Sequence, residues 1–193
     1  ETRSVLVMLQ PAGAWALFGV SLDELADAHV SLADLLPPRE IRELEERIDA
    51  SEAPRSINTA VQSFLLRALE RSRQSVHPAI RAATSRLMME RGNLRIEALA
   101  AQLGLGKRQL ERLFRLQVGV SPREFAALAR FAWTADQVMA GRPIVDIAAE
   151  AGYADQAHLI RTFVKRTGQT PGRFTPEDVA DVAFVQSPPS TTA

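Results

Sequence analysis

The hydrophobic positions between residues 96 and 174 follow one pattern twice. The first copy covers residues 96–125 and the second covers residues 144–174, with one extra residue in the second copy. A repeat of this length indicates one supersecondary unit used twice. Each copy has apolar residues at helical spacing in two short segments that a three-residue turn separates. This arrangement predicts a pair of helix-turn-helix units.

In the first copy, residues 96–103 form one predicted helix and residues 107–117 form the next. Gly104 lies between them, where a positive φ ends the first helix at low cost. The apolar stripe of the second helix is predicted to face inward and contains Leu110, Leu113, Phe114 and Val118.

The second copy places a helix at residues 144–151, a turn at 152–154 and a second helix at 155–167. Asp155 is a good N-cap for that helix, whereas the first copy offers only Gly106, a weaker one. Leu159 and Phe163 are expected to face inward, together with Ala157 or Val164.

A longer helix is predicted between the copies, over residues 122–140. Ser121 and Glu124 have capping-box spacing, and Pro122 takes the first helical position. Apolar spacing then continues to the end of the helix at Phe125, Leu128, Ala129, Ala132, Ala135, Val138 and Met139. Such a helix spans about 28 Å, and successive major-groove faces lie roughly 34 Å apart. One rod can therefore hold two reading helices on one side of a duplex.

Another helix is predicted upstream of the repeat, over residues 78–91, with Ile80, Ala83, Leu87 and Met88 on one face. Further upstream, residues 39–50 and 55–71 form two predicted helices, and residues 71–75 form a polar linker. Their stripes contain Ile41, Leu44 and Ile48 in the first helix, and Ile57, Val61, Phe64, Leu65 and Leu69 in the second.

The first thirty residues have a weaker pattern. Residues 5–9 predict a short strand, residues 11–13 a turn, and residues 14–18 and 22–26 short helical turns. A single strand cannot pair its own edges, so it is expected to be disordered, swapped or paired with another chain.

The repeat region, from about residue 77 to 174, resembles the DNA-binding domain of the AraC/XylS family of bacterial transcription regulators. The resemblance rests on A-x-x-x-G and L-x-R-x-F in both copies, and on the strings GYADQAHL at 152–159 and GQTPGRF at 168–174. It departs at Gly106, where the family usually has a capping serine, and at Phe174-Thr175, where an arginine or tyrosine is common. The resemblance implies a mainly α fold, in which two helix-turn-helix units joined by a linker helix enter adjacent major-groove segments.

Three regions follow from this interpretation. Residues 76–175 are the expected DNA-binding domain, residues 1–72 resemble a remnant of the family's amino-terminal sensing region, and residues 176–193 are expected to form a short helix and a disordered tail. The start at Glu1, on an apparent strand, suggests a piece of a longer protein. No ligand pocket is expected in the remnant. Helices 39–50 and 55–71 can serve as a homodimer surface or pack back on their own chain, and the pattern does not separate the two.

Charge is unevenly distributed along a chain whose formal net charge is zero. Residues 1–75 contain 8 Lys/Arg and 12 Asp/Glu, whereas residues 76–175 contain 15 and 8. A net positive charge is found only in the region with the repeats, as expected for binding to phosphates.

Both second helices of the repeat carry candidate DNA contacts. The resemblance places the base contacts near the amino-terminal ends of these helices, at Arg108, Glu111, Arg112, Gln156, Ala157, Ile160 and Arg161. Arginine can bond guanine, glutamate can accept from cytosine, and glutamine can pair with adenine, while Ala157 or Ile160 can contact thymine methyls. Four further cations are better placed for phosphates, namely Lys107, Arg115, Lys165 and Arg166.

No enzyme chemistry is indicated. The chain has no cysteine, and its three histidines, His29, His77 and His158, have no metal-ligand spacing. His158 is expected to pack its ring in the second unit. There is no glycine-rich phosphate loop and no serine nucleophile elbow. We therefore expect no catalytic residue, metal or cofactor. No apolar run is long enough for a membrane span, and a location in the bacterial cytoplasm is expected.

The sequence predicts a sequence-specific regulator that binds double-stranded DNA. The resemblance favours an activator that recruits RNA polymerase, with an unknown small-molecule effector. The alternative is an interaction protein in which the acidic amino-terminal helices bind a partner and DNA affinity has been lost.

Overall fold

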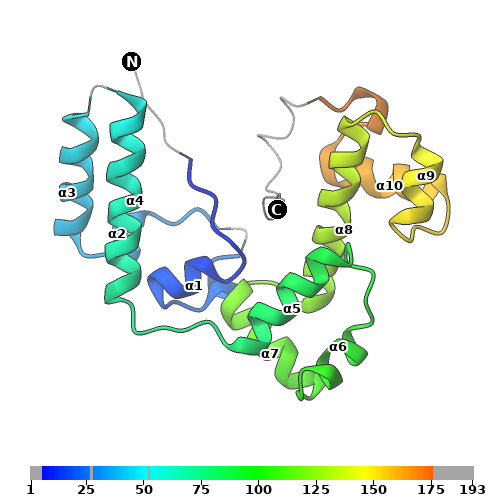
Figure 1. The fold of residues 1–193 in the computed structure, drawn as a ribbon, viewed down its shortest axis with the longest axis horizontal. Coiled ribbons are helices and arrows are strands. Elements are labelled where there is room, and N and C mark those ends of the chain that lie inside the picture. Colours follow the sequence, from blue (N-terminus) through cyan, green and yellow to red (C-terminus); the bar gives the residue numbers. More distant parts are fainter. Residues whose placement is uncertain (1–5, 27, 52, 176–193) are drawn as a thin grey trace, which may run out of the picture. The chain divides into compact units, whose positions relative to one another are not determined.

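A computed structural model describes residues 6–26, 28–51 and 53–175. These residues are mainly helical, as the sequence predicts (Figure 1). The chain divides into two units. The first contains the described residues up to Arg81 together with Arg108–Ser121. The second contains Ala82–Lys107 and the described residues from Pro122 onward. No helix in the described ranges is long and apolar enough to cross a membrane.

The described residues form ten α-helices and two short 3₁₀ turns. The amino-terminal elements are α1 (Gly13–Phe18), the 3₁₀ turn η1 (Leu22–Glu24), α2 (Leu32–Leu35), α3 (Pro38–Asp49) and α4 (Pro54–Arg71). The later elements are α5 (Pro78–Met89), α6 (Ile96–Gln102), α7 (Lys107–Val118), α8 (Pro122–Met139), α9 (Ile144–Glu150), α10 (Gln156–Thr167) and the 3₁₀ turn η2 (Pro171–Arg173). Every predicted helix that lies in the described ranges is present, with bounds shifted by a few residues.

Helix α4 packs against α3 and α1 in the first unit (Figure 1). Its buried stripe is Ile57, Val61, Phe64 and Ala68. The prediction that Leu69 belongs to this stripe is wrong, because its side chain is 46% exposed. The helical spacing of the buried residues continues to Ala68. Leu69 lies about 100° further round the helix axis and so outside the buried face. Ion pairs link α3 and α4, with Arg71 bound to Glu40 at 2.5 Å.

The predicted strand at residues 5–9 is a second correction. Residues 6–9 form no strand, and their side chains are 41–83% exposed. The described residues contain no strand that could pair with this segment, so its backbone has no ladder to join. Val5 lies outside the described residues, as do the predicted short helix and tail at 176–193.

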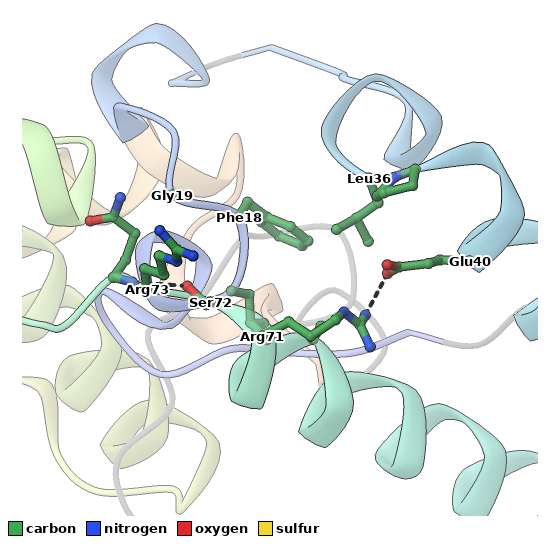
Figure 2. A pocket seen from close by; sticks show the side chains of 11 residues that line it. Phe18, Gly19, Leu36, Glu40, Arg71, Ser72 and Arg73 are labelled. Atoms are coloured by element: carbon green, nitrogen blue, oxygen red, sulfur yellow. Dashed lines mark hydrogen bonds and ion pairs between the residues drawn. The ribbon is translucent and has the colours of Figure 1, made fainter.

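The first unit also contains a hollow of about 410 Å³ next to α4, shown in Figure 2. The sequence pattern did not predict this hollow, and the expectation of no ligand pocket in this region stays a prediction. The lining residues come from α1, from the α2–α3 junction with the start of α3, and from the end of α4 with the residues that follow it. Segments so far apart in the chain leave no common pattern in the sequence.

The second unit has a core built around α8, α9 and α10 (Figure 1). Its buried members are Phe131, Ala135, Ile147, Ala148, Ala151, Tyr153, Leu159, Phe163 and Phe174. Trp133, Val138 and Ile144 pack against this core. The apolar faces of the second helix-turn-helix and of the preceding long helix therefore share one interior.

Most predicted inward positions of the repeat region are buried, with several exceptions. Met139 is 37% exposed because α8 ends there, and Val164 is 36% exposed. Ala157 is exposed as well, so neither alternative for the third inward residue of α10 holds. In α7, Gln117 is buried while Val118 is only partly buried.

The glycines that end the first helix of each copy have the predicted positive φ. The value is +68° at Gly104 and +71° at Gly152. Each helix-turn-helix therefore turns where the sequence indicates.

Candidate nucleic-acid interface

Helix α10 presents a polar face to solvent. The Asp155 side chain accepts a hydrogen bond from the backbone N–H of His158 at 2.6 Å, so the predicted N-cap is confirmed. Gln156, Ala157 and Arg161 are exposed, and Ile160 is partly exposed. The candidate base contacts of the second unit thus all lie on the accessible side of a capped helix.

Aromatic packing fixes the position of α10. The Phe163 ring lies 5.3 Å from the Phe131 ring of α8 and 5.1 Å from the Phe174 ring that follows η2. Contacts between rings at this distance add to the stabilisation from burial. The His158 ring packs edge-on against Tyr153 at 5.4 Å, which confirms the predicted packing role although His158 is exposed overall. The close packing of α10 on α8 sets the direction of its exposed face.

An ionic cluster that the sequence pattern did not reveal joins the residues after α5 to α8 and α9. The Arg91 guanidinium lies 4.2 Å from the centre of the Trp133 ring and 3.3 Å from a Glu150 carboxylate oxygen. Arg142 donates to the same carboxylate. Hydrogen bonding from Arg142 lowers the pKa of Glu150 below its usual value. No sequence signal could have revealed this cluster, because its members are widely separated and have no common spacing.

Helix α7 presents the candidate contacts of the first unit. Arg108, Arg112 and Arg115 are exposed, and Glu111 is partly exposed. The opposite face is buried and contains Leu110, Leu113, Phe114 and Gln117. Polar and apolar side chains therefore lie on opposite faces of α7, as is required of a helix that enters a DNA groove.

The buried Gln117 is the second feature that was not predicted. Its side-chain oxygen accepts a hydrogen bond from the backbone N–H of His77 at 2.9 Å. The residue continues the inward spacing of Leu110, Leu113 and Phe114, and this spacing is the signal that could have identified it. A buried amide needs a partner, so the bond ties α7 to the segment before α5.

Lys107 already has a protein partner. Its ammonium lies 2.6 Å from a carboxylate oxygen of Glu97 in α6. The hydrogen bond from Lys107 lowers the pKa of Glu97 below its usual value. A DNA phosphate would have to compete with this carboxylate for the ammonium group.

The remaining candidate cations make fewer contacts with other protein groups. The Arg166 guanidinium lies 5.5 Å from the centre of the Phe131 ring. Within the described part of the chain, no ion pair involves the five other candidate cations, Arg108, Arg112, Arg115, Arg161 and Lys165. Exposed arginines without an ion pair can donate to phosphates or to guanine.

Residues 99–176 match a protein family described as "Helix-turn-helix domain". The chain is 30% identical over 80 residues to the virulence regulon transcriptional activator VirF of Yersinia enterocolitica, which covers 41% of this chain and 30% of the relative. It is 29% identical over 133 residues to the arabinose operon regulatory protein of Escherichia coli, a match that covers 64% of this chain and 46% of the relative. It is 31% identical over 91 residues to the HTH-type transcriptional regulator ExsA of Pseudomonas aeruginosa, a match that covers 45% of this chain and 33% of the relative.

Through residues 99–176, the chain has a helix-turn-helix domain similar to that of AraC/XylS-type transcription regulators. The family match includes α7, α8, α9 and α10, and so all the candidate DNA contacts. The chain spans less than half the length of each of these relatives. No solved structure matches the chain.

Proposed function

We propose that this chain binds double-stranded DNA in a sequence-specific manner, with the exposed faces of α7 and α10 in two adjacent major-groove segments. The observation that carries the proposal is that both helices are amphipathic and lie inside an AraC/XylS-type region. Each buries its apolar side and leaves arginines and other candidate base-contacting side chains exposed or partly exposed. The excess of basic residues in 76–175 adds the attraction to phosphates.

Within this proposal, seven residues contact bases: Arg108, Glu111, Arg112, Gln156, Ala157, Ile160 and Arg161. Lys107, Arg115, Lys165 and Arg166 contact phosphates, which position the protein without selecting a sequence. Lys107 is the weakest member of the second group because Glu97 already binds its ammonium.

An activator role is the finer proposal. It is supported by the name of the Yersinia enterocolitica relative, a transcriptional activator. In this proposal the DNA-bound chain recruits RNA polymerase. The 133-residue match to the Escherichia coli regulator is longer than the helix-turn-helix match. The similarity therefore extends beyond the helix-turn-helix domain, and we assign residues 1–72 to a remnant of the sensing region, 76–175 to the DNA-binding domain and 176–193 to a short helix and tail.

A homodimer through residues 39–71 is supported by the outer face of α4. Leu66 is 60% exposed and Leu69 is 46% exposed, one turn apart on the helix. The inner face of α4 packs on its own chain, so the outer face is the one that a second copy would cover.

The test is a binding measurement on DNA selected from a random pool, at two salt concentrations. Specific binding should weaken steeply with salt because counterions are released from phosphates. Arg112→Ala and Arg161→Ala should each cost about 1–3 kcal/mol and relax preference at a few base pairs. Lys165→Ala should weaken all sequences alike and reduce the salt slope by about 1.

Arg39→Ala is the matched control, since Arg39 is an exposed cation at the start of α3, outside the helix-turn-helix match. It should leave the selected sequence unchanged. If the pool yields no preferred sequence and the arginine variants behave like this control, the chain is instead an interaction protein without specific DNA affinity.

A further inference from the structure

The hollow beside α4 has the size of a small-molecule site. Its volume of about 410 Å³ lies within the range of roughly 300–1,000 Å³ that ligand pockets occupy. Its walls come from the end of α1, the start of α3, the last turn of α4 and the segment after α4. All of them belong to the first unit.

One part of the wall is apolar and accessible. Figure 2 shows the side chains of Phe18 and Leu36 next to each other at the hollow. Both residues are only half-buried, so part of their apolar surface remains open to a ligand. Ala68, which also lines the hollow, is 4% exposed and closes the wall on the α4 side.

The polar part of the wall carries an excess of positive charge. Glu40 and Arg71 pair at 2.5 Å and neutralise each other, as Figure 2 shows. Arg73 lines the same hollow and makes no ion pair with any described residue. The carboxyl-terminal end of α4 and the amino-terminal end of α3 contribute opposite partial charges, which do not change this balance.

The guanidinium groups at this wall have donors that no carboxylate of the described lining takes up. A guanidinium has five N–H donors, and Glu40 engages a single nitrogen of Arg71. Among the described residues that line the hollow, the only carboxylate is the one already paired with Arg71. The wall is therefore better suited to an anion than to a cation.

We propose that this hollow binds a small organic carboxylate with an apolar body. The apolar body contacts Phe18 and Leu36, and the carboxylate accepts hydrogen bonds from Arg73 and from the remaining donors of Arg71. Charge-assisted hydrogen bonds of this kind supply the selectivity for the anion. The proposal is independent of DNA binding by α7 and α10.

The test is an NMR titration of the whole chain with three probes: 4-phenylbutanoate, its neutral amide and acetate. The acid should shift the backbone resonances of Gly19, Ser72 and Gln74, which line the hollow. The amide should bind about tenfold more weakly, because it lacks the charge. Acetate should bind more weakly than the acid, because it lacks the apolar body.

Arg73→Gln should reduce affinity for the acid about tenfold and leave affinity for the amide unchanged. Arg73 is exposed, so this change should not affect folding. Arg39→Gln removes an exposed cation outside the lining and should change neither affinity. Equal affinity for acid and amide, no shift at these residues up to millimolar acid, or equal effects of the two variants would overturn the proposal.

Discussion

The two helix-turn-helix units share a sequence pattern but differ in what holds their second helices. Helix α10 is held by its own neighbours, through the contacts of Phe163 with Phe131 and Phe174. Helix α7 has its buried Gln117 bonded to His77, 40 residues upstream. The residue after α7, Gly119, lies against the carbonyl of Leu22. A repeated pattern thus specifies the same element twice, while the surroundings that support each copy differ.

This difference also appears in the division of the chain. From Arg108 on, α7 is grouped with the amino-terminal residues, whereas α9 and α10 are grouped with α8. The contrast predicts that damage to the support of α10 stays within the second unit. Damage near α7 should instead extend to the amino-terminal segments.

The largest expected effect is that of Phe163→Ala. Phe163 is 1% exposed between two rings, so the substitution should lower the free energy of unfolding of the second unit by about 3–5 kcal/mol. Hydrogen exchange should show lost protection in α8, α9 and α10, with α3 and α4 retaining theirs. Val164→Ala, at a 36% exposed neighbour, is the control and should change stability by less than about 1 kcal/mol. Equal loss of protection in α3 and α4 would show that the units unfold together.

A smaller effect is expected from Gly119→Ala, which tests the support of α7. Gly119 has a φ of +91°, and a Cβ there would lie 2.9 Å from the carbonyl oxygen of Leu22. Strain and this clash should together cost about 2–3 kcal/mol in urea denaturation. Gly104→Ala is the matched control, because Gly104 also has a positive φ but no atom within 4 Å of the added Cβ. It should cost about 1 kcal/mol, and equal costs for both variants would argue against the contact with Leu22.

The smallest effect concerns the caps. Asp155→Ala removes the bond to the His158 N–H and should cost about 1 kcal/mol in thermal unfolding. Gly106→Ser places a capping side chain just before α7, where a Cβ meets no atom within 4 Å. It should gain a few tenths of a kcal/mol. If Asp155→Ala and Gly106→Ser both raise or both lower the free energy of unfolding, then α10 is not the better capped of the two helices.

The sequence could predict the helices because periodicity and turn residues are local. Gly104, Gly152 and Asp155 determine φ or cap a helix through their own chemistry, and all three have the predicted conformation or bond. Placement of a side chain at a helix end was less predictable. Leu69 and Met139 extend an apolar pattern but lie where the packed face ends, and both are exposed.

Contacts between distant segments could not be predicted from the sequence. Arg91, Trp133 and Glu150 come together only through packing, and nothing in their spacing indicates it. The hollow lined by Phe18, Leu36 and Arg73 likewise depends on separate segments meeting. The candidate DNA contacts follow from the family pattern, and their roles remain predictions for the binding measurements.

The chain has two tryptophans, and each unit contains one of them. Trp15 donates from its indole nitrogen to the carbonyl of Ser75 at 3.4 Å, while Trp133 lies beneath the Arg91 guanidinium. Their emission spectra should therefore respond to different events. With either tryptophan replaced by phenylalanine, the fluorescence of the other becomes an optical reporter for a single half of the molecule, with no added label.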